Sequence, residues 1–372
     1  MKICTMTCHH VYNYGATLQA FALQHYLESL GHEVEIIDYR LPSHRRYDWS
    51  YIYPVGRLYN LTQKIPFLKW PVSLYRNRNY LKTWGRKKSF DKFDAKYLHI
   101  TAQTYRTTEE LRSNPPKADM YIAGSDQIWN PEYENGHMPG YYLDFGDNDT
   151  KRISYAASFG VTSLSKDQKE FIRNKLKFFS SLSVREKSGI HILSEVGLNA
   201  AHTLDPVFLL SKDQWIKELE LEVGEQNYIM IYDFNHDNIQ MVDYVKKLSK
   251  SENLKIISIN DADKAPYADI QVNNAGPREF LQYLLNAKYV IGASFHATAF
   301  SILFNKKFAT FPLIALSNSS RMTDLLKSLN LEDRFTPNDI NIIKKNEEWE
   351  IINEMLIKQI KASKYYIINA LS

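Results

Sequence analysis

The sequence predicts an α/β protein with parallel sheets in two successive halves. The chain opens with apolar strand patterns at Met1–Thr7 and Val34–Tyr39, separated by the helical apolar spacing of Gly15–Leu30. Such a βαβ unit implies a parallel sheet. A second α/β series starts near Ser211, and 372 residues are enough for about two domains.

Each half contains further strands and helices with the expected periodicity. In the first half, Gly31 ends the opening helix. The later elements are the strand Met120–Gly124, a strand and loop at Arg152–Gly160, the helix Lys166–Phe179 and a strand end at Leu182–Glu186. In the second half, we expect strands at Tyr228–Tyr232, Lys255–Ile259, Tyr289–Ile291 and Phe308–Phe311. The expected helices there are Asn238–Leu248, Pro277–Asn286, Thr298–Phe304, Ser320–Leu329 and Glu347–Ser363.

The predicted domain limits follow from this series. We expect an N-terminal domain at 1–210, a C-terminal domain at 211–345 and a terminal helix at 346–372 that packs back on the N-terminal domain. No Gly/Ser linker separates the halves, which favours two domains that share a cleft.

Composition excludes several classes of protein. The chain is 44% hydrophobic and 24% charged, as in ordinary globular proteins, and has no run of 18 apolar residues. The N-terminus lacks the apolar core of a signal peptide. Cys4 and Cys8, four residues apart on a strand, are about 13 Å apart, too far for a disulfide. Without a matching ligand set we expect no metal, and we expect a reduced, cytoplasmic protein.

A basic and aromatic insertion is expected at about 44–93. From Arg45 to Lys92 the chain has twelve Lys or Arg against two Asp, a net charge of +10, which leaves −6 for the rest. The same window holds three Trp and six Tyr. This composition suits packing of the rings on the parent domain, contact with an anionic membrane, or single-stranded nucleic acid. We do not expect a nucleic-acid partner.

The most informative motif is Val290–Phe300. A buried strand ends there and a helix follows, so Ser294 and His296 lie at the carboxyl end of a strand and the start of a helix. Such a position binds anions, and a histidine there can transfer a proton near neutral pH. A purely structural histidine is the alternative interpretation.

Two other strand ends carry polar residues. Asn13 can cap the first helix, and Gly15 would let a ligand approach its N-terminus. After the strand Met120–Gly124 come Asp126, Gln127, Trp129 and Asn130, a set of side chains that suits a sugar. A plain helix cap in the first case, and a capping turn in the second, are the alternatives.

Two arginines complete the set of candidates. Arg185 follows a strand end and could grip a carboxylate or phosphate, or form a surface pair with Glu186. Arg321 opens a helix together with Ser319 and Ser320, where free N–H groups favour an anion, or it is simply solvated.

Taken in order, these motifs resemble the polysaccharide pyruvyl transferase family. The matching stretches span about residues 3–335, and the insertion and the terminal helix fall outside them. They are Asn13–Ala20, Gly124–Asn130, Ser183–Glu186, Leu204–Pro206, Ser294–Phe300 and Ser319–Arg321. The resemblance implies two Rossmann-like domains facing across a cleft, similar to GT-B glycosyltransferases.

The resemblance also implies a reaction. The enolpyruvyl carbon of phosphoenolpyruvate would be transferred to two hydroxyls of a surface-polysaccharide sugar, forming a cyclic pyruvate ketal and releasing phosphate, with no cofactor. The family's acceptors are often linked to polyprenyl diphosphate, which fits a protein at the inner face of the plasma membrane.

On this interpretation, His296 transfers a proton and Asp126 orients or deprotonates the acceptor. The donor would contact Arg185, Ser294, Arg321 and Lys306, and the acceptor would contact Asn13, Tyr14, Gly15, Gln127, Trp129 and Asn130. Some family members have an arginine where this chain has Ser294, and Arg321 or Lys306 would then replace it.

Two other functions are open. One is a GT-B nucleotide-sugar glycosyltransferase, for which Glu332 is a candidate ribose ligand. The other is a non-catalytic scaffold that binds polysaccharide or lipid, which Ser294 in place of arginine would favour.

Overall fold

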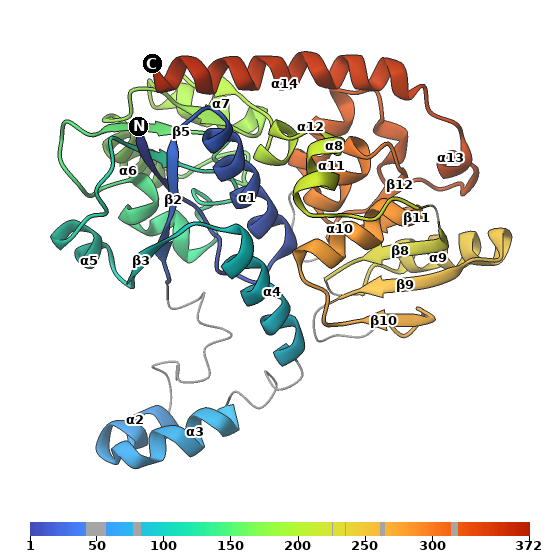
Figure 1. Cartoon of the computed structure of the whole chain (residues 1–372), viewed down its shortest axis with the longest axis horizontal. Coiled ribbons are helices and arrows are strands. Elements are labelled where there is room, and N and C mark those ends of the chain that lie inside the picture. The colour runs from blue at the N-terminus through green and yellow to red at the C-terminus, as the bar shows by residue number, and fades with distance from the viewer. Residues whose placement is uncertain (42–56, 77–82, 225, 235, 261–264, 314–318) are drawn as a thin grey trace.

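The computed structural model describes residues 1–41, 57–76, 83–224, 226–234, 236–260, 265–313 and 319–372. The segments 42–56 and 77–82, which belong to the predicted insertion, lie outside the described residues. The two lobes of the molecule are each built around a five-stranded parallel sheet (Figure 1).

The first sheet has the strand order β3-β2-β1-β4-β5, and every pairing in it is parallel. The strands are β1 (Lys2–Met6), β2 (Glu33–Tyr39), β3 (Ile100–Tyr105), β4 (Met120–Ala123) and β5 (Lys151–Ser154). The helices of this half are α1 (Tyr14–Ser29), α4 (Trp84–Tyr97), α5 (Thr108–Ser113), α6 (Lys166–Leu176) and α7 (Lys187–Glu195). Two short strands, β6 (Ser183–Val184) and β7 (Ala201–His202), pair with each other.

The second sheet repeats this order as β10-β9-β8-β11-β12, again all parallel. Its strands are β8 (Gln226–Tyr232), β9 (Lys255–Ile259), β10 (Ile270–Val272), β11 (Ala287–Gly292) and β12 (Lys307–Thr310). The helices are α8 (Lys212–Glu218), α9 (Ile239–Glu252), α10 (Pro277–Asn286), α11 (Phe295–Leu303), α12 (Ser320–Lys327), α13 (Asn341–Lys344) and α14 (Trp349–Leu371). The α/β fold with parallel sheets is thus confirmed.

The repeated strand order fixes where a ligand can bind. In each sheet the chain first builds strands to one side of the central strand and then reverses, so the reversal falls between β1 and β4 and between β8 and β11. Ligands of open α/β sheets bind at the carboxyl ends of the strands at such a reversal.

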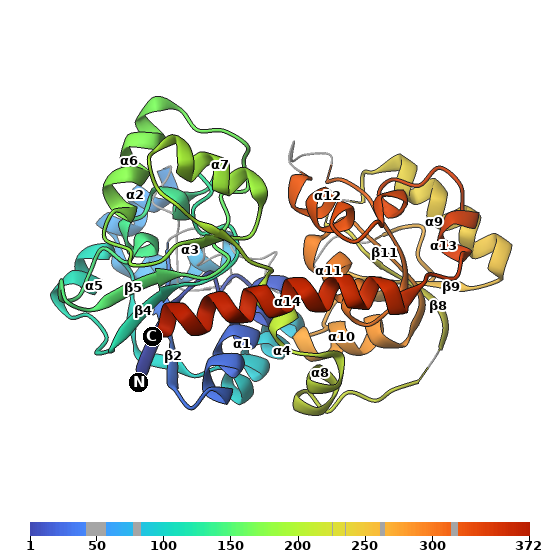
Figure 2. The same cartoon turned by 90° about the horizontal axis from the view of Figure 1, so that it is seen from above.

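The two lobes are joined by a continuous hydrophobic core. Tyr14 of α1 stacks on Phe280 of α10 with ring centroids 4.5 Å apart, and Trp215 of α8 packs against Phe21 and Phe300. Residues of both lobes belong to one buried cluster. Helix α14 lies across both lobes (Figure 2), and its Tyr366 hydroxyl donates to the Ser154 carbonyl at 2.9 Å.

The described part of the insertion has two different environments. Helix α4 is packed on the body of the protein, since Phe90 and Phe93 are buried and the Arg86 guanidinium donates to the Tyr12 carbonyl at 2.8 Å. The helices α2 (Arg57–Lys64) and α3 (Lys69–Arg76), with the short helix η2 (Pro66–Leu68), project away from the body (Figure 1). The packing interpretation therefore holds for α4.

Two details bear on the remaining sequence predictions. Cys4 and Cys8 are buried and unbridged. Within the described part of the chain, each helix is too short or too polar to span a bilayer.

Candidate functional site

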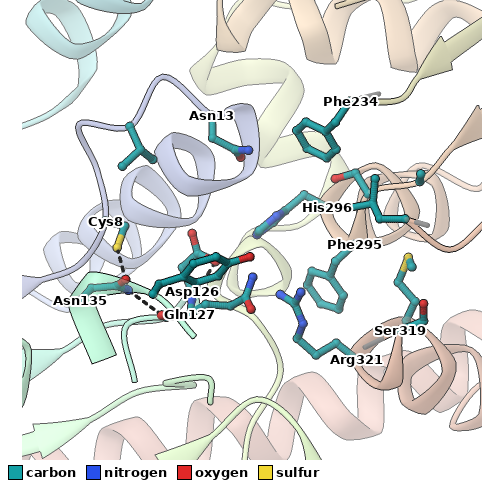
Figure 3. Close-up of a pocket in the computed structure, with 16 residues that line it drawn as sticks. Cys8, Asn13, Asp126, Gln127, Asn135, Phe234, Phe295, His296, Ser319 and Arg321 are labelled. Carbon is teal, nitrogen blue, oxygen red and sulfur yellow. Dashed lines mark hydrogen bonds between the residues drawn. The ribbon is translucent and has the colours of Figure 1, made fainter. Parts of the chain in front are cut away.

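A pocket of about 530 Å³ lies between the facing edges of the two sheets. Its polar lining comes from both lobes (Figure 3). The N-terminal lobe contributes Asn13, Asp126, Gln127 and Asn135, and the C-terminal lobe contributes Ser294, His296, Ser319 and Arg321. The loops after β1, β4, β8 and β11 all reach the pocket, as the strand orders require.

His296 enters the pocket from the first turn of α11. Strand β11 ends at Gly292 and α11 begins at Phe295, not at Thr298 as predicted. The difference arises because Ser294 has the extended backbone of an N-cap residue, and its carbonyl accepts the Thr298 amide at 3.1 Å. The first amides of the helix have no carbonyl partner one turn back, so positive partial charge faces the pocket.

Asp205 holds the imidazole of His296 from behind. The Asp205 Oδ2 atom lies 3.4 Å from His296 Nε2, 2.6 Å from Arg185 Nη1 and 3.1 Å from Ser125 Oγ. Burial alone would raise the pKa of Asp205, but the charges and hydrogen bonds of His296 and Arg185 outweigh it and hold that pKa well below its usual range. Asp205 is therefore ionised at neutral pH and places a buried negative charge beside His296.

Gly15 allows this histidine to reach Asp205. A Cβ atom on Gly15 would lie 1.9 Å from His296 Nδ1, so the ring of one lobe packs directly on the first helical turn of the other. We predicted that Gly15 leaves room for a ligand, but the space is occupied by the imidazole. Asn13 caps the same helix as predicted, because its side chain accepts the Gly15 and Ala16 amides at 2.9 Å and 3.2 Å.

Asp126 has a left-handed backbone, with φ of 71°, which aspartate tolerates better than most residues. Its Oδ1 atom accepts the Gln127 amide at 2.9 Å and lies 3.7 Å from Arg185 Nη2. Asp126 and Gln127 both line the pocket, opposite His296 and Arg321 (Figure 3). This edge therefore offers carboxylate and amide groups to a ligand.

Arg321 supplies a guanidinium to the pocket lining. It opens α12, and its guanidinium lies 5.9 Å from the centre of the Phe295 ring. Burial and the like charge of Arg185 lower the pKa of Arg321 to about 10, so the group is still cationic at neutral pH. Arg321 can therefore bind an anionic ligand.

Arg185 and Glu186 do not form the surface pair considered above, because both are buried. The Arg185 side chain is only 1% exposed, does not line the pocket, and pairs with Asp205. Glu186 accepts the amides of Phe159 and Gly160 at 2.7 Å and 3.1 Å and holds that loop in place. Arg185 is thus placed to position Asp205 rather than to touch a ligand.

Four other predicted contacts do not line the pocket. Lys306 follows the C-terminus of α11, so it lies at the opposite end of that helix, and its Nζ donates to the Leu285 carbonyl at 2.9 Å. Trp129 is fully buried, and its indole donates to the Tyr141 carbonyl at 3.1 Å. The Asn130 amide donates to Gln127 Oε1 at 2.7 Å, and the Tyr14 hydroxyl donates to the Ala275 carbonyl at 3.0 Å. Of these side chains, Asn130 bonds directly to one that lines the pocket, that of Gln127.

Asp205 was missed as a site residue. It is the N-cap of the short helix η6 (Pro206–Leu209), and its Oδ1 accepts the Val207 amide at 3.1 Å. An Asp-Pro pair predicts such a turn, and nothing local shows that the second oxygen faces Arg185 and His296. In the described ranges, three or more His, Cys, Asp or Glu side chains nowhere come together as they would around a metal ion.

Solved structures share the two-lobed architecture at low identity. An α-glucosyltransferase in complex with UDP and a 13-mer DNA containing a central A:G mismatch is 10% identical, with a TM-score of 0.51 over 98% of this chain and 93% of that one. The spinosyn forosaminyltransferase SpnP is 10% identical, with a TM-score of 0.48 over 100% and 98%. The UDP-GlcNAc 2-epimerase of Methanocaldococcus jannaschii, in complex with UDP-GlcNAc and UDP, is 12% identical, with a TM-score of 0.46 over 98% and 100%. The fold is GT-B-like, and the likeness shows the fold alone.

The family assignment comes from the sequence. The model of the family described as polysaccharide pyruvyl transferase matches residues 13–313. This range includes the pocket residues named above, with the exception of Ser319 and Arg321. No curated protein matches the chain. The chain belongs to the polysaccharide pyruvyl transferase family.

Proposed function

We propose that this protein transfers the enolpyruvyl group of phosphoenolpyruvate to two hydroxyls of one surface-polysaccharide sugar, forming a cyclic pyruvate ketal and releasing phosphate. The observation that carries the proposal is the arrangement of the pocket. The Arg321 guanidinium faces the carboxylate of Asp126 and the amide of Gln127 across the pocket, and the lining residue His296 is paired with the buried Asp205 behind it. This arrangement suits a donor that carries a phosphate and a carboxylate, and a hydroxylated acceptor.

The reaction needs two proton acceptors and one proton donor. The methylene carbon of phosphoenolpyruvate gains a proton, which leaves an oxocarbenium-like centre at C2. One sugar hydroxyl bonds to C2 and loses its proton; the C2–O bond to phosphate breaks; the second hydroxyl then bonds to C2 and loses its proton. One of the two released protons replaces the proton given to the methylene, and the other leaves with phosphate.

His296 is the proposed proton-transfer residue. It lines the pocket, and the ionised Asp205 next to its Nε2 stabilises the imidazolium that forms when a hydroxyl proton is taken up. Asp126, on the opposite edge, is the second proton acceptor or the group that orients the acceptor. Asp205 and Arg185 are positioning residues in this scheme.

The donor is assigned to the C-terminal lobe. Arg321 matches a carboxylate or phosphate with its forked donors, and the N-terminus of α11 at Ser294 adds partial positive charge. The acceptor is assigned to the other edge, where Gln127 and Asn13 can pair with sugar hydroxyls.

A thermal shift measurement tests the donor assignment. A ligand that binds only the folded protein raises its stability, by about 2.7 kcal/mol at a hundred times its Kd. We expect phosphoenolpyruvate to raise the unfolding temperature and UDP to leave it unchanged, with the phosphoenolpyruvate shift lost in Arg321→Gln. Stabilisation by UDP and not by phosphoenolpyruvate would instead support a nucleotide-sugar glycosyltransferase.

A further inference from the structure

The helical pair α2–η2–α3, residues 57–76, has the composition of a membrane-binding surface. These 20 residues contain four Lys or Arg and no Asp or Glu. The side chains of Arg57, Lys64 and Lys69 are exposed. A segment with this charge is attracted to anionic surfaces and finds no compensating carboxylate within itself.

Large apolar side chains of the same segment are exposed to solvent. Phe67 of η2 is 79% exposed and Trp70 of α3 is 74% exposed, three residues apart in the sequence around the junction of η2 and α3, which we call the tip. Leu58 and Leu61 of α2 are each 39% exposed. A soluble protein rarely exposes several large apolar side chains in one short segment, so the tip is expected to be covered by a partner.

The shape of the segment fits this role. The helices α2 and α3 pack mainly against each other through η2 and extend from the N-terminal lobe (Figure 1). Helix α4, from the same insertion, has its aromatic rings Phe90 and Phe93 buried in the core. The contrast shows that the insertion can bury rings where packing requires it, and that the rings of the tip are left outside.

We propose that α2–η2–α3 docks this protein on an anionic lipid bilayer, with Phe67 and Trp70 inserted at headgroup depth and Lys64 and Lys69 paired with lipid phosphates. Trp is favoured at this depth, and each cation near the surface contributes about 1 kcal/mol. The proposal does not depend on the reaction proposed above. Strand β2 ends at the sheet edge that carries the pocket, and the insertion follows it, so docking would bring that edge toward a lipid-linked substrate.

The test uses the full chain and sedimentation with two kinds of vesicle. We expect binding to vesicles containing phosphatidylglycerol and weak binding to pure phosphatidylcholine. The double variant Lys64→Gln/Lys69→Gln should bind the anionic vesicles about 30-fold more weakly, taking about 1 kcal/mol for each cation. Phe67→Ser/Trp70→Ser should lower binding by at least tenfold even at low salt.

Matched controls separate this surface from general charge and hydrophobicity. Lys217→Gln/Lys358→Gln removes two exposed cations elsewhere, and Phe178→Ser/Tyr365→Ser removes two exposed rings that are 69% and 70% exposed. Both controls should bind like the unmodified protein. Equal losses in variants and controls, no binding to anionic vesicles, or binding of single-stranded oligonucleotides in place of vesicles would each overturn the proposal.

A soluble glycoside acceptor keeps the two proposals distinct. Phosphate release with that acceptor should be the same in Phe67→Ser/Trp70→Ser as in the unmodified protein, because these residues lie outside the pocket. Vesicle binding without any phosphate release would support the docking surface and contradict the proposed reaction.

Discussion

The two sheets reach the pocket with the same topology but bring opposite chemistry to it. At the edge of the first sheet, the loops after β1 and β4 carry Asn13, Asp126 and Gln127. At the edge of the second sheet, the first turns of α11 and α12 place His296 and Arg321 at the pocket. Identical strand orders therefore do not make the two edges equivalent. The difference is the basis for our proposal that the anionic donor binds at the second sheet and the hydroxylated acceptor at the first.

The largest effect is expected from the residue between the two edges. His296→Ala should lower kcat by about 10²–10⁴-fold, the usual contribution of general acid–base catalysis, with little change in the KM for phosphoenolpyruvate. Phosphate release measured at saturating substrates checks this. His191→Ala, which removes an exposed histidine on α7, is the control. Full turnover in His296→Ala would contradict the assignment of His296 as the proton-transfer residue.

The next effect concerns the carboxylate that supports His296. Asp205→Asn leaves the buried Arg185 without its 2.6 Å ion pair, and such a loss costs about 3–5 kcal/mol of unfolding free energy. The pKa of Asp205 is lowered in the folded protein, so its contribution is present above the unfolded value of about 3.9 and is lost as the pH falls below that value. Urea unfolding between pH 3 and 8 measures both effects.

Asp94 of α4 offers a matched control, because its pKa is shifted in the opposite direction to that of Asp205. It is also buried, but burial and nearby Asp91 raise its pKa to about 7, despite the opposing effect of His9. The folded state then holds a proton that the unfolded state releases, so stability falls as the pH rises from about 4 to about 7. Asp94→Asn should therefore stabilise the protein at pH 8, and a loss of stability there would contradict this account of buried carboxylates.

A smaller effect is expected from Arg321, at the edge of the second sheet where we propose that the donor binds. Arg321→Gln should raise the KM for phosphoenolpyruvate by about 10–100-fold, because a charged hydrogen bond contributes about 1.5–3 kcal/mol. Lys306→Gln should leave that KM unchanged, since Lys306 lies at the other end of α11. If the two variants behaved alike, the donor would not be bound where the second sheet meets the pocket.

The smallest effect is expected from Gln127, at the edge of the first sheet where we propose that the acceptor binds. Gln127→Ala removes one neutral hydrogen-bonding group from the lining and should raise the KM for the acceptor by about 3–10-fold, with that for phosphoenolpyruvate unchanged. Initial rates at varied acceptor concentration measure it. An increase in the phosphoenolpyruvate KM alone would reverse the assignment of the two edges.

The sequence was sufficient for most of the fold. Long apolar or periodic segments such as Tyr228–Tyr232 and Pro277–Asn286 were found close to their observed bounds. Strands β3 and β10 were missed, because β3 is rich in polar residues and β10 has three residues. Both are edge strands, whose formation depends on the neighbouring strand more than on local pattern.

The candidate site was found only in part, for a related reason. His296, Asp126 and Arg321 follow strand ends or open a helix, so topology alone brings them to the pocket. Whether a side chain at such a position faces the ligand or the core is decided by packing between distant segments. Trp129 therefore faces the core, although the sequence placed it among the ligand contacts. Asp205 pairs with His296, although no pattern in the neighbouring sequence predicts this.

The central claim is tested most directly by the product itself. The protein is incubated with phosphoenolpyruvate and a panel of nitrophenyl or lipid-linked glycosides, and both free phosphate and product mass are measured. The account predicts one phosphate released for each glycoside that gains one ketal-linked pyruvate, and no product with His296→Ala. Transfer of a sugar from a nucleotide donor, with no pyruvate gained from phosphoenolpyruvate on any glycoside, would contradict it.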